Sequence, residues 1–168
     1  MITRREAALK WAVTSACAMV LFFLHSLTLS HLDLWGVTPF LPPILIAVLC
    51  SIENDLPSII FSLIFGVLCD LALGGLFPCL YTVTFFLSAL LILVLGHSVL
   101  QPGFFCALIS AAVTFLLVAV FSSAVLLYAG SATLGACASL FARELFASLL
   151  WLPLCYAVFS QLHKFFTV

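Results

Sequence analysis

Residues 57–73 read PSIIFSLIFGVLCDLAL, a hydrophobic run that contains one charged residue, Asp70. A helix needs roughly 20 mostly apolar residues to cross the hydrocarbon core of a bilayer, and this run comes close to that length. Because no water is present there, backbone polar groups must find partners within the segment, which excludes open strands. The run therefore predicts a transmembrane helix that carries a single carboxylate.

The rest of the chain has the same character. Of its 168 residues, 66% are hydrophobic and 7% are charged, and the mean hydropathy is +1.41. A soluble domain is nearer 45–50% apolar and roughly 25% charged. Five basic and six acidic side chains cannot cover a water-exposed surface, and they form no basic patch for nucleic acid. The composition predicts an all-α polytopic membrane protein that is one domain over residues 1–168.

The same hydrophobic window predicts about six transmembrane helices in one bundle. The expected spans, in chain order, are 11–29, 39–52, 57–73, 77–95, 104–128 and 140–162. The second span is short for a full crossing. It contains Pro42 and Pro43, which suit the first turn of a helix because a missing N–H group costs little there.

Basic residues near the ends of the chain predict its orientation. Arg4, Arg5 and Lys10 precede the first span, and cytoplasmic segments carry an excess of such residues. An even number of crossings returns the C-terminus to the same side, where Lys164 agrees. We therefore expect a multi-pass membrane protein with both termini in the cytoplasm.

Small residues follow one face of the helix over 57–73. The residues at intervals of four are Ser58, Ser62, Gly66, Asp70 and Gly74, and they drift slowly around the helix. Small side chains let the backbone of another helix come close, which is the usual basis of packing in lipid. The stripe predicts a tight helix contact, either inside the chain or with another protein. For Asp70 three roles stay open: an interfacial carboxylate, a packing or partner contact, and proton or ion coupling.

Arg143 and Glu144 are the other charges in a hydrophobic setting. They lie near the start of the last span, which the predicted topology puts on the same outer side as Asp70. Opposite charge at matching depth predicts an ion pair between Asp70 and Arg143. The alternative is that Arg143 extends alone to the lipid phosphates.

No short motif supports enzyme chemistry. The cysteines lack C-x-x-C spacing, and the histidines lie in separate segments without H-E-x-x-H spacing. Neither a G-x-S-x-G nucleophile motif nor a P-loop is present. We therefore expect free thiols, no metal site, no cofactor and no catalytic activity.

Three features in residues 34–93 resemble the MreD family, the small polytopic membrane subunits of the bacterial rod-shape machinery. The first is Gly36-Val37-Thr38-Pro39 before a short hydrophobic segment, and the second is a polar turn over 51–55. The third is Gly66-x-x-x-Asp70 followed by Gly74-Gly75. The chain departs from the family at Phe40, where a polar residue is common, and in lacking Leu-Gly after the second glycine.

The resemblance implies a non-catalytic role and an architecture similar to the substrate-binding subunits of energy-coupling vitamin transporters. Such a protein packs against MreC, a single-span protein with an external domain. It thereby helps to position the cell-wall elongation synthase and the MreB filaments in the bacterial plasma membrane. The motif positions are Pro39, Gly66, Asp70 and Gly74, and Ser62 joins them through the stripe of small residues.

The alternative is a substrate-binding subunit of an energy-coupling vitamin transporter. The size, six helices and the pair Ala12-x-x-x-Ala16 would fit that class. A binding subunit should bury several polar groups around its ligand. The outer half offers Asp70, Arg143, Glu144 and scattered hydroxyls, so the sequence favours the scaffold. A small membrane enzyme is a third alternative, but the sequence shows no group of polar residues that could form its active site.

Overall fold

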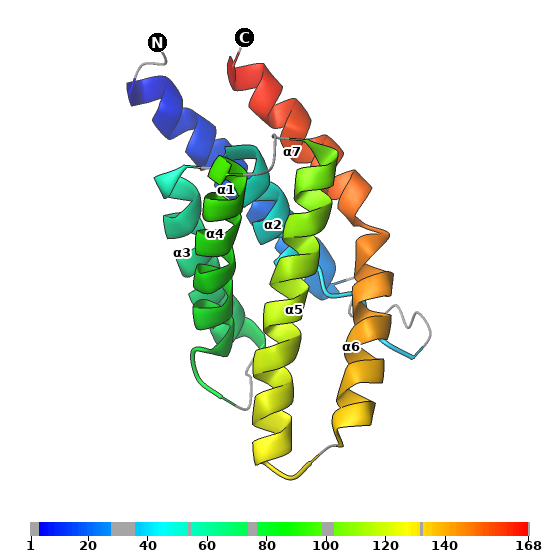
Figure 1. Cartoon of the computed structure of the whole chain (residues 1–168). Coiled ribbons are helices and arrows are strands. Elements are labelled where there is room, and N and C mark those ends of the chain that lie inside the picture. The colour runs from blue at the N-terminus through cyan, green and yellow to red at the C-terminus, as the bar shows by residue number, and fades with distance from the viewer. Residues whose placement is uncertain are drawn as a thin grey trace.

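The computed structural model describes residues 4–27, 36–53, 55–73, 77–98, 103–131 and 133–167, which hold seven helices and no β-strand. In chain order the helices are α1 (Arg4–Leu27), α2 (Pro42–Glu53), α3 (Leu56–Leu73), α4 (Leu80–Ser98), α5 (Phe104–Tyr128), α6 (Leu134–Leu149) and α7 (Leu152–Thr167). The start of α1 and the end of α7 lie at the same end of the bundle (Figure 1). The all-α prediction is confirmed.

Helix α2 forms the centre of the core. Every residue from Pro42 to Ser51 is buried, and the helix contacts α3, α4, α5 and α7. It has 12 residues, which at 1.5 Å per residue gives a length of about 18 Å. The hydrocarbon core is about 30 Å thick, so α2 alone is too short to cross it.

The buried start of α2 has few backbone donors to satisfy. The first N–H groups of any helix lack partners inside the helix, but Pro42 and Pro43 carry no N–H group at all. The amides of Ile44 and Leu45 both donate to the Leu41 carbonyl, at 2.9 and 3.1 Å. Just before the helix, the Phe40 amide donates to Ser148 Oγ on α6 at 2.7 Å. The helix can therefore begin in an apolar interior without unpaired donors at these positions.

Within the described ranges, three helices are long and apolar enough to cross a membrane: Ala8–Leu27, Leu56–Leu73 and Phe104–Tyr128. The pair α6 and α7 adds a fourth crossing if it counts as one bent span, and α2 and Leu80–Gly96 are shorter apolar helices. The chain is therefore a helical membrane protein with three to four spans of sufficient length. The total of six stays a prediction.

The prediction of one continuous helix over 140–162 is wrong. Helix α6 already begins at Leu134 and ends at Leu149, and α7 follows from Leu152 with a bend of 46° between them. Pro153 explains the break, because its ring clashes with the carbonyl four residues earlier and it cannot donate a hydrogen bond. The turn is closed by Trp151, whose amide donates to the Ser148 carbonyl at 2.9 Å.

Replacing Ser148 by Ala tests the junction between α6 and the start of α2. Ser148 is fully buried, so the substitution leaves the Phe40 amide without an acceptor. An unsatisfied buried donor costs about 1–3 kcal/mol. We expect Ser148→Ala to lower the unfolding temperature of the detergent-solubilised protein. The control is Ser139→Ala on the same helix, because Ser139 is exposed and bonds only to its own helix. Equal effects of the two variants would contradict this account.

Candidate functional site

Gly66 on α3 lies against the backbone of α4. A Cβ atom at this position would lie 2.7 Å from Thr82 Cα and 3.0 Å from the Tyr81 carbonyl oxygen. Both atoms belong to the backbone, so neither can move aside as a flexible side chain could. Gly66 therefore permits an approach between α3 and α4 that any other residue would prevent.

Asp70, one turn after Gly66, caps the start of α4. Its Oδ1 accepts a hydrogen bond from the Tyr81 amide at 2.9 Å. Its Oδ2 accepts from the Thr82 amide at 2.9 Å and from Thr82 Oγ1 at 2.6 Å. A carboxylate suits this place because the first amides of a helix lack partners and carry partial positive charge. Gly66 and Asp70 thus act together: one brings the helices close and the other closes the end of α4.

The remaining residues of the predicted packing site are placed as follows. Ser62 and Ser58 are buried, and their hydroxyls donate to Ile59 and Asp55 carbonyls at 2.8 and 2.6 Å. Pro39 is fully buried before α2, and Gly74 lies outside the described residues. Gly66 and Asp70 both contact α4. The tight helix contact predicted for these two residues is therefore inside the chain.

The predicted ion pair between Asp70 and Arg143 is not formed in the described part of the chain, where Asp70 interacts with α4 instead. The three hydrogen bonds that Asp70 accepts already stabilise its negative charge. Arg143 is exposed on α6. The prediction matched the two residues by depth alone, and depth does not fix the direction in which a side chain points around its helix.

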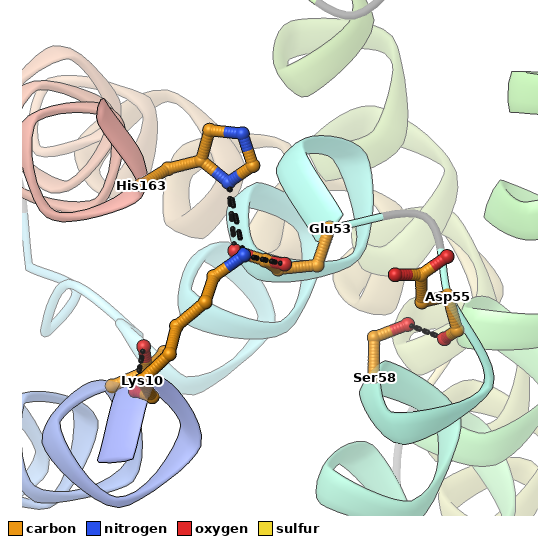
Figure 2. A network of polar contacts seen from close by, with 6 residues as sticks. Lys10, Glu53, Asp55, Ser58 and His163 are labelled. Atoms are coloured by element: carbon orange, nitrogen blue, oxygen red, sulfur yellow. Dashed lines mark hydrogen bonds and ion pairs between the residues drawn. The ribbon is translucent and has the colours of Figure 1, made fainter. Parts of the chain in front are cut away.

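An ion triad, buried at Lys10 and Glu53 and partly exposed at His163, joins three helices at the end of the bundle where α1 begins and α7 ends. Glu53 is the last residue of α2, and its Oε2 lies 2.6 Å from Lys10 Nζ of α1. Its Oε1 lies 2.9 Å from His163 Nδ1 of α7. The Lys10 and Glu53 side chains are only 10% and 8% exposed. Figure 2 shows the three side chains pointing toward one another.

The contact between Glu53 and His163 depends on the tautomer of the histidine. An ionised carboxylate only accepts hydrogen bonds, so the contact is a hydrogen bond in the form of His163 whose Nδ1 carries a hydrogen. Lys10 Nζ lies 3.4 Å from His163 Nδ1. The backbone carbonyl of Lys10 accepts a hydrogen bond from Thr14 Oγ1 at 2.8 Å. The sequence analysis missed this triad. Its signal was present, because Lys10 and Glu53 carry opposite charges, and His163 a polar ring, at span ends that the predicted topology puts on one side.

Hollows on the described surface are lined mainly by apolar residues. One of about 220 Å³ lies between α1 and α3, and one of about 540 Å³ lies beside α4 and α5. A third, of about 590 Å³, lies between α5 and α6. Small residues on both of its walls are Ala112, Ala119, Ser123, Ala138 and Ala142. We call this third hollow the α5–α6 groove.

Among the described residues no group of three or more His, Cys, Asp or Glu side chains could hold a metal ion. No family model matches the chain, and neither a curated protein nor a solved structure is similar to it. The function is therefore argued from the residues and their geometry.

Gly66→Ala should destabilise the α3–α4 pair. The added methyl group must displace the backbone at Thr82, and overpacking of this kind costs about 1–3 kcal/mol. We expect a lower unfolding temperature in detergent. The matched control is Gly135→Ala on α6, which meets nothing within 4 Å and should be neutral or stabilising because Gly weakens a helix. A harmless Gly66→Ala would show that the helices are not in backbone contact.

Glu53→Gln should leave the buried Lys10 charge without a counter-ion. Removing one partner of a buried pair costs about 3–5 kcal/mol, so we expect a large fall in thermal stability. Asp55→Asn is the control, since Asp55 is exposed and lies apart from the triad in Figure 2. A double-mutant cycle with Lys10→Met measures the coupling; additive effects would mean that the two side chains do not interact.

Proposed function

We propose that this chain is a non-catalytic scaffold subunit of the bacterial rod-shape and cell-wall elongation complex. The resemblance of residues 34–93 to the MreD family supports the proposal. The Gly66-x-x-x-Asp70 motif, which carries much of that resemblance, has a structural use here because it joins α3 to α4. The buried hydroxyls of Ser51, Thr84 and Ser88 also donate to carbonyls of their own helices. Hydroxyls used in this way are satisfied within their own helices and leave few polar groups for catalysis.

The proposal includes the finer topology. Helices α1, α3, α4 and α5 cross the plasma membrane, α2 crosses with the extended residues before it, and α6 with α7 forms the sixth passage. Both termini then lie in the cytoplasm, as the basic residues near the ends favour. That α1 begins and α7 ends at one end of the bundle (Figure 1) agrees with an even number of crossings.

The observation that carries the scaffold proposal is the α5–α6 groove. It is apolar, and its α5 wall belongs to a helix long enough to span the membrane. Ala119 and Ser123 on α5, and Ala138 and Ala142 on α6, are pairs of small residues four positions apart. Such pairs let a further helix backbone come close, and close packing drives helix association in lipid. The occupant we propose is the membrane helix of an MreC-type single-span protein, with the elongation synthase and MreB filaments joined through it.

Ala138→Leu should fill the groove and weaken partner binding while the fold is kept. The measurement is affinity purification of the C-terminally tagged protein from native membranes in mild detergent, with mass spectrometry of what accompanies it. We expect an MreC-type protein with the wild type and at least a tenfold loss with Ala138→Leu, because a clash of about 1.4 kcal/mol is enough for that factor. Ala136→Leu is the matched control, since Ala136 is exposed on the same helix and does not line the groove.

The vitamin-transporter subunit is the second candidate. The observation in its favour is a group of polar side chains beyond the start of the short α2, around Phe40. The same purification separates the two functions. A transport ATPase pair with its membrane coupling subunit, recovered without any shape protein, would replace the scaffold proposal by the transporter.

A further inference from the structure

Helix α1 contacts the rest of the bundle along one narrow line. On its other faces Leu9, Val20 and Phe23 are each more than half exposed. Residues three or four apart share one face of a helix, and the buried residues of α1 have this spacing. Within residues 8–27, where the side chains of α1 are described, they are Lys10, Thr14, Ala18, Phe22 and His25. A small part of the surface of α1 therefore attaches it to the bundle.

Long aromatic side chains connect α1 to α3. The ring centroids of Trp11 and Phe61 lie 6.5 Å apart, and those of Phe22 and Phe65 lie 5.5 Å apart. Residues of both helices also line the hollow of about 220 Å³ described above. Among the described residues, the backbone of α1 approaches α7 at the most positions, whereas α3 packs mainly against α4. Close backbone packing is what holds helices together in lipid, so the contact between α1 and α3 is a weak one.

Helix α1 does not need the bundle in order to stay in the membrane. Its segment Ala8–Leu27 is long and apolar enough to cross a bilayer, and a helix satisfies its backbone groups internally. Lipid tails are as apolar as the side chains that α1 would leave, so no hydrophobic penalty opposes its separation. The short central helix α2 has no such independence, because it cannot span the hydrocarbon core by itself.

The ion pair between Lys10 and Glu53 is the strong contact of α1. Lys10 Nζ and Glu53 Oε2 lie 2.6 Å apart, and the two side chains are 10% and 8% exposed. Attraction between opposite charges is strong where water is excluded. The hydroxyl of Thr14, the next residue along the buried line, donates to a carbonyl of α1 itself. Lys10 lies near the outer end of α1, where a long charged side chain can reach the headgroups once the pair is broken.

We propose that α1 is a displaceable helix, which leaves the bundle as an intact transmembrane span, and that the Lys10–Glu53 ion pair is the latch that holds it in place. Its departure uncovers the aromatic side of α3, where the stacked rings of Phe61 and Phe65 have centroids 5.5 Å apart. This surface then faces lipid or a further helix. The movement does not depend on the scaffold role, because no residue of α1 lines the α5–α6 groove.

The test uses photo-crosslinking in the full chain, in native membranes. The crosslinking amino acid p-benzoylphenylalanine is placed at Ile60 in one reporter and at Val83 in a second. Ile60 is 53% exposed and lines the hollow between α1 and α3, so it reports on α1. Val83 is 45% exposed and lines the hollow beside α4 and α5, so it reports on the rest of the bundle. Mass spectrometry measures the yield of each crosslink.

Lys10→Met should release α1 and leave the other helices together. We expect the crosslink from Ile60 to α1 to fall several-fold, with lipid adducts in its place, while the crosslink from Val83 to α5 is unchanged. Lys10→Arg should keep the α1 crosslink because it keeps the charge opposite Glu53. Lys164→Met is the matched control, since Lys164 is exposed on α7 and takes no part in the triad. The proposal is overturned if Lys10→Met leaves the α1 crosslink unchanged or lowers both crosslinks equally.

A second variant displaces α1 without changing a charge, and it decides the question if Lys10→Met is not inserted into the membrane. Ala18 is fully buried on the line by which α1 is attached, so Ala18→Leu should push α1 away from the bundle. We again expect loss of the crosslink from Ile60 to α1 and an intact crosslink from Val83 to α5. Ala12→Leu is the control, because Ala12 is exposed on the same helix. If Ala18→Leu lowers both crosslinks or neither, α1 is a fixed part of the core.

Discussion

The structure depends on a helix that is buried on every side and is too short to cross the bilayer. Because α2 occupies the centre, both of its ends lie where unpaired backbone or charged groups are unfavourable. At the start, two prolines remove donors and Ser148 accepts the amide before them. At the end, Glu53 is held by Lys10 and His163. The contacts of Glu53 at the end of α2 thus help to position α1, which carries Lys10, and α7, which carries His163.

The need to pair the backbone groups at a helix end also explains the contact between α3 and α4. The start of α4 has amides without partners in the helix, and Asp70 of the preceding helix accepts from two of them. Gly66 makes that possible by letting the backbones approach. A motif that in the sequence predicts a tight contact, either inside the chain or with another protein, therefore joins α3 to the start of α4 in this chain. The apolar α5–α6 groove lies elsewhere, on the later part of the bundle.

Hydrophobic length located most helices because it reflects the bilayer directly. The predicted span 104–128 has the bounds of α5, and 57–73 differs from α3 by one residue. The break between α6 and α7 was missed because a hydropathy window averages over Pro153. Gly66 and Asp70 could be predicted as a tight contact, but a stripe of small residues does not name the helix it meets. The ion triad was missed because its three members lie in distant parts of the chain, and only a comparison of the charges at several span ends could have brought them together.

The link between α1, α2 and α7 also bears on how the protein is made. Helices enter the membrane in the order of synthesis, so Lys10 and Glu53 can meet early, whereas His163 arrives only with α7, which follows the other six described helices in the chain. Until α7 is inserted, the side of α2 that contacts it faces lipid. Closure of the bundle must therefore wait until α7 is inserted, and a chain truncated before α7 would present an incomplete core to the quality-control proteases of the membrane.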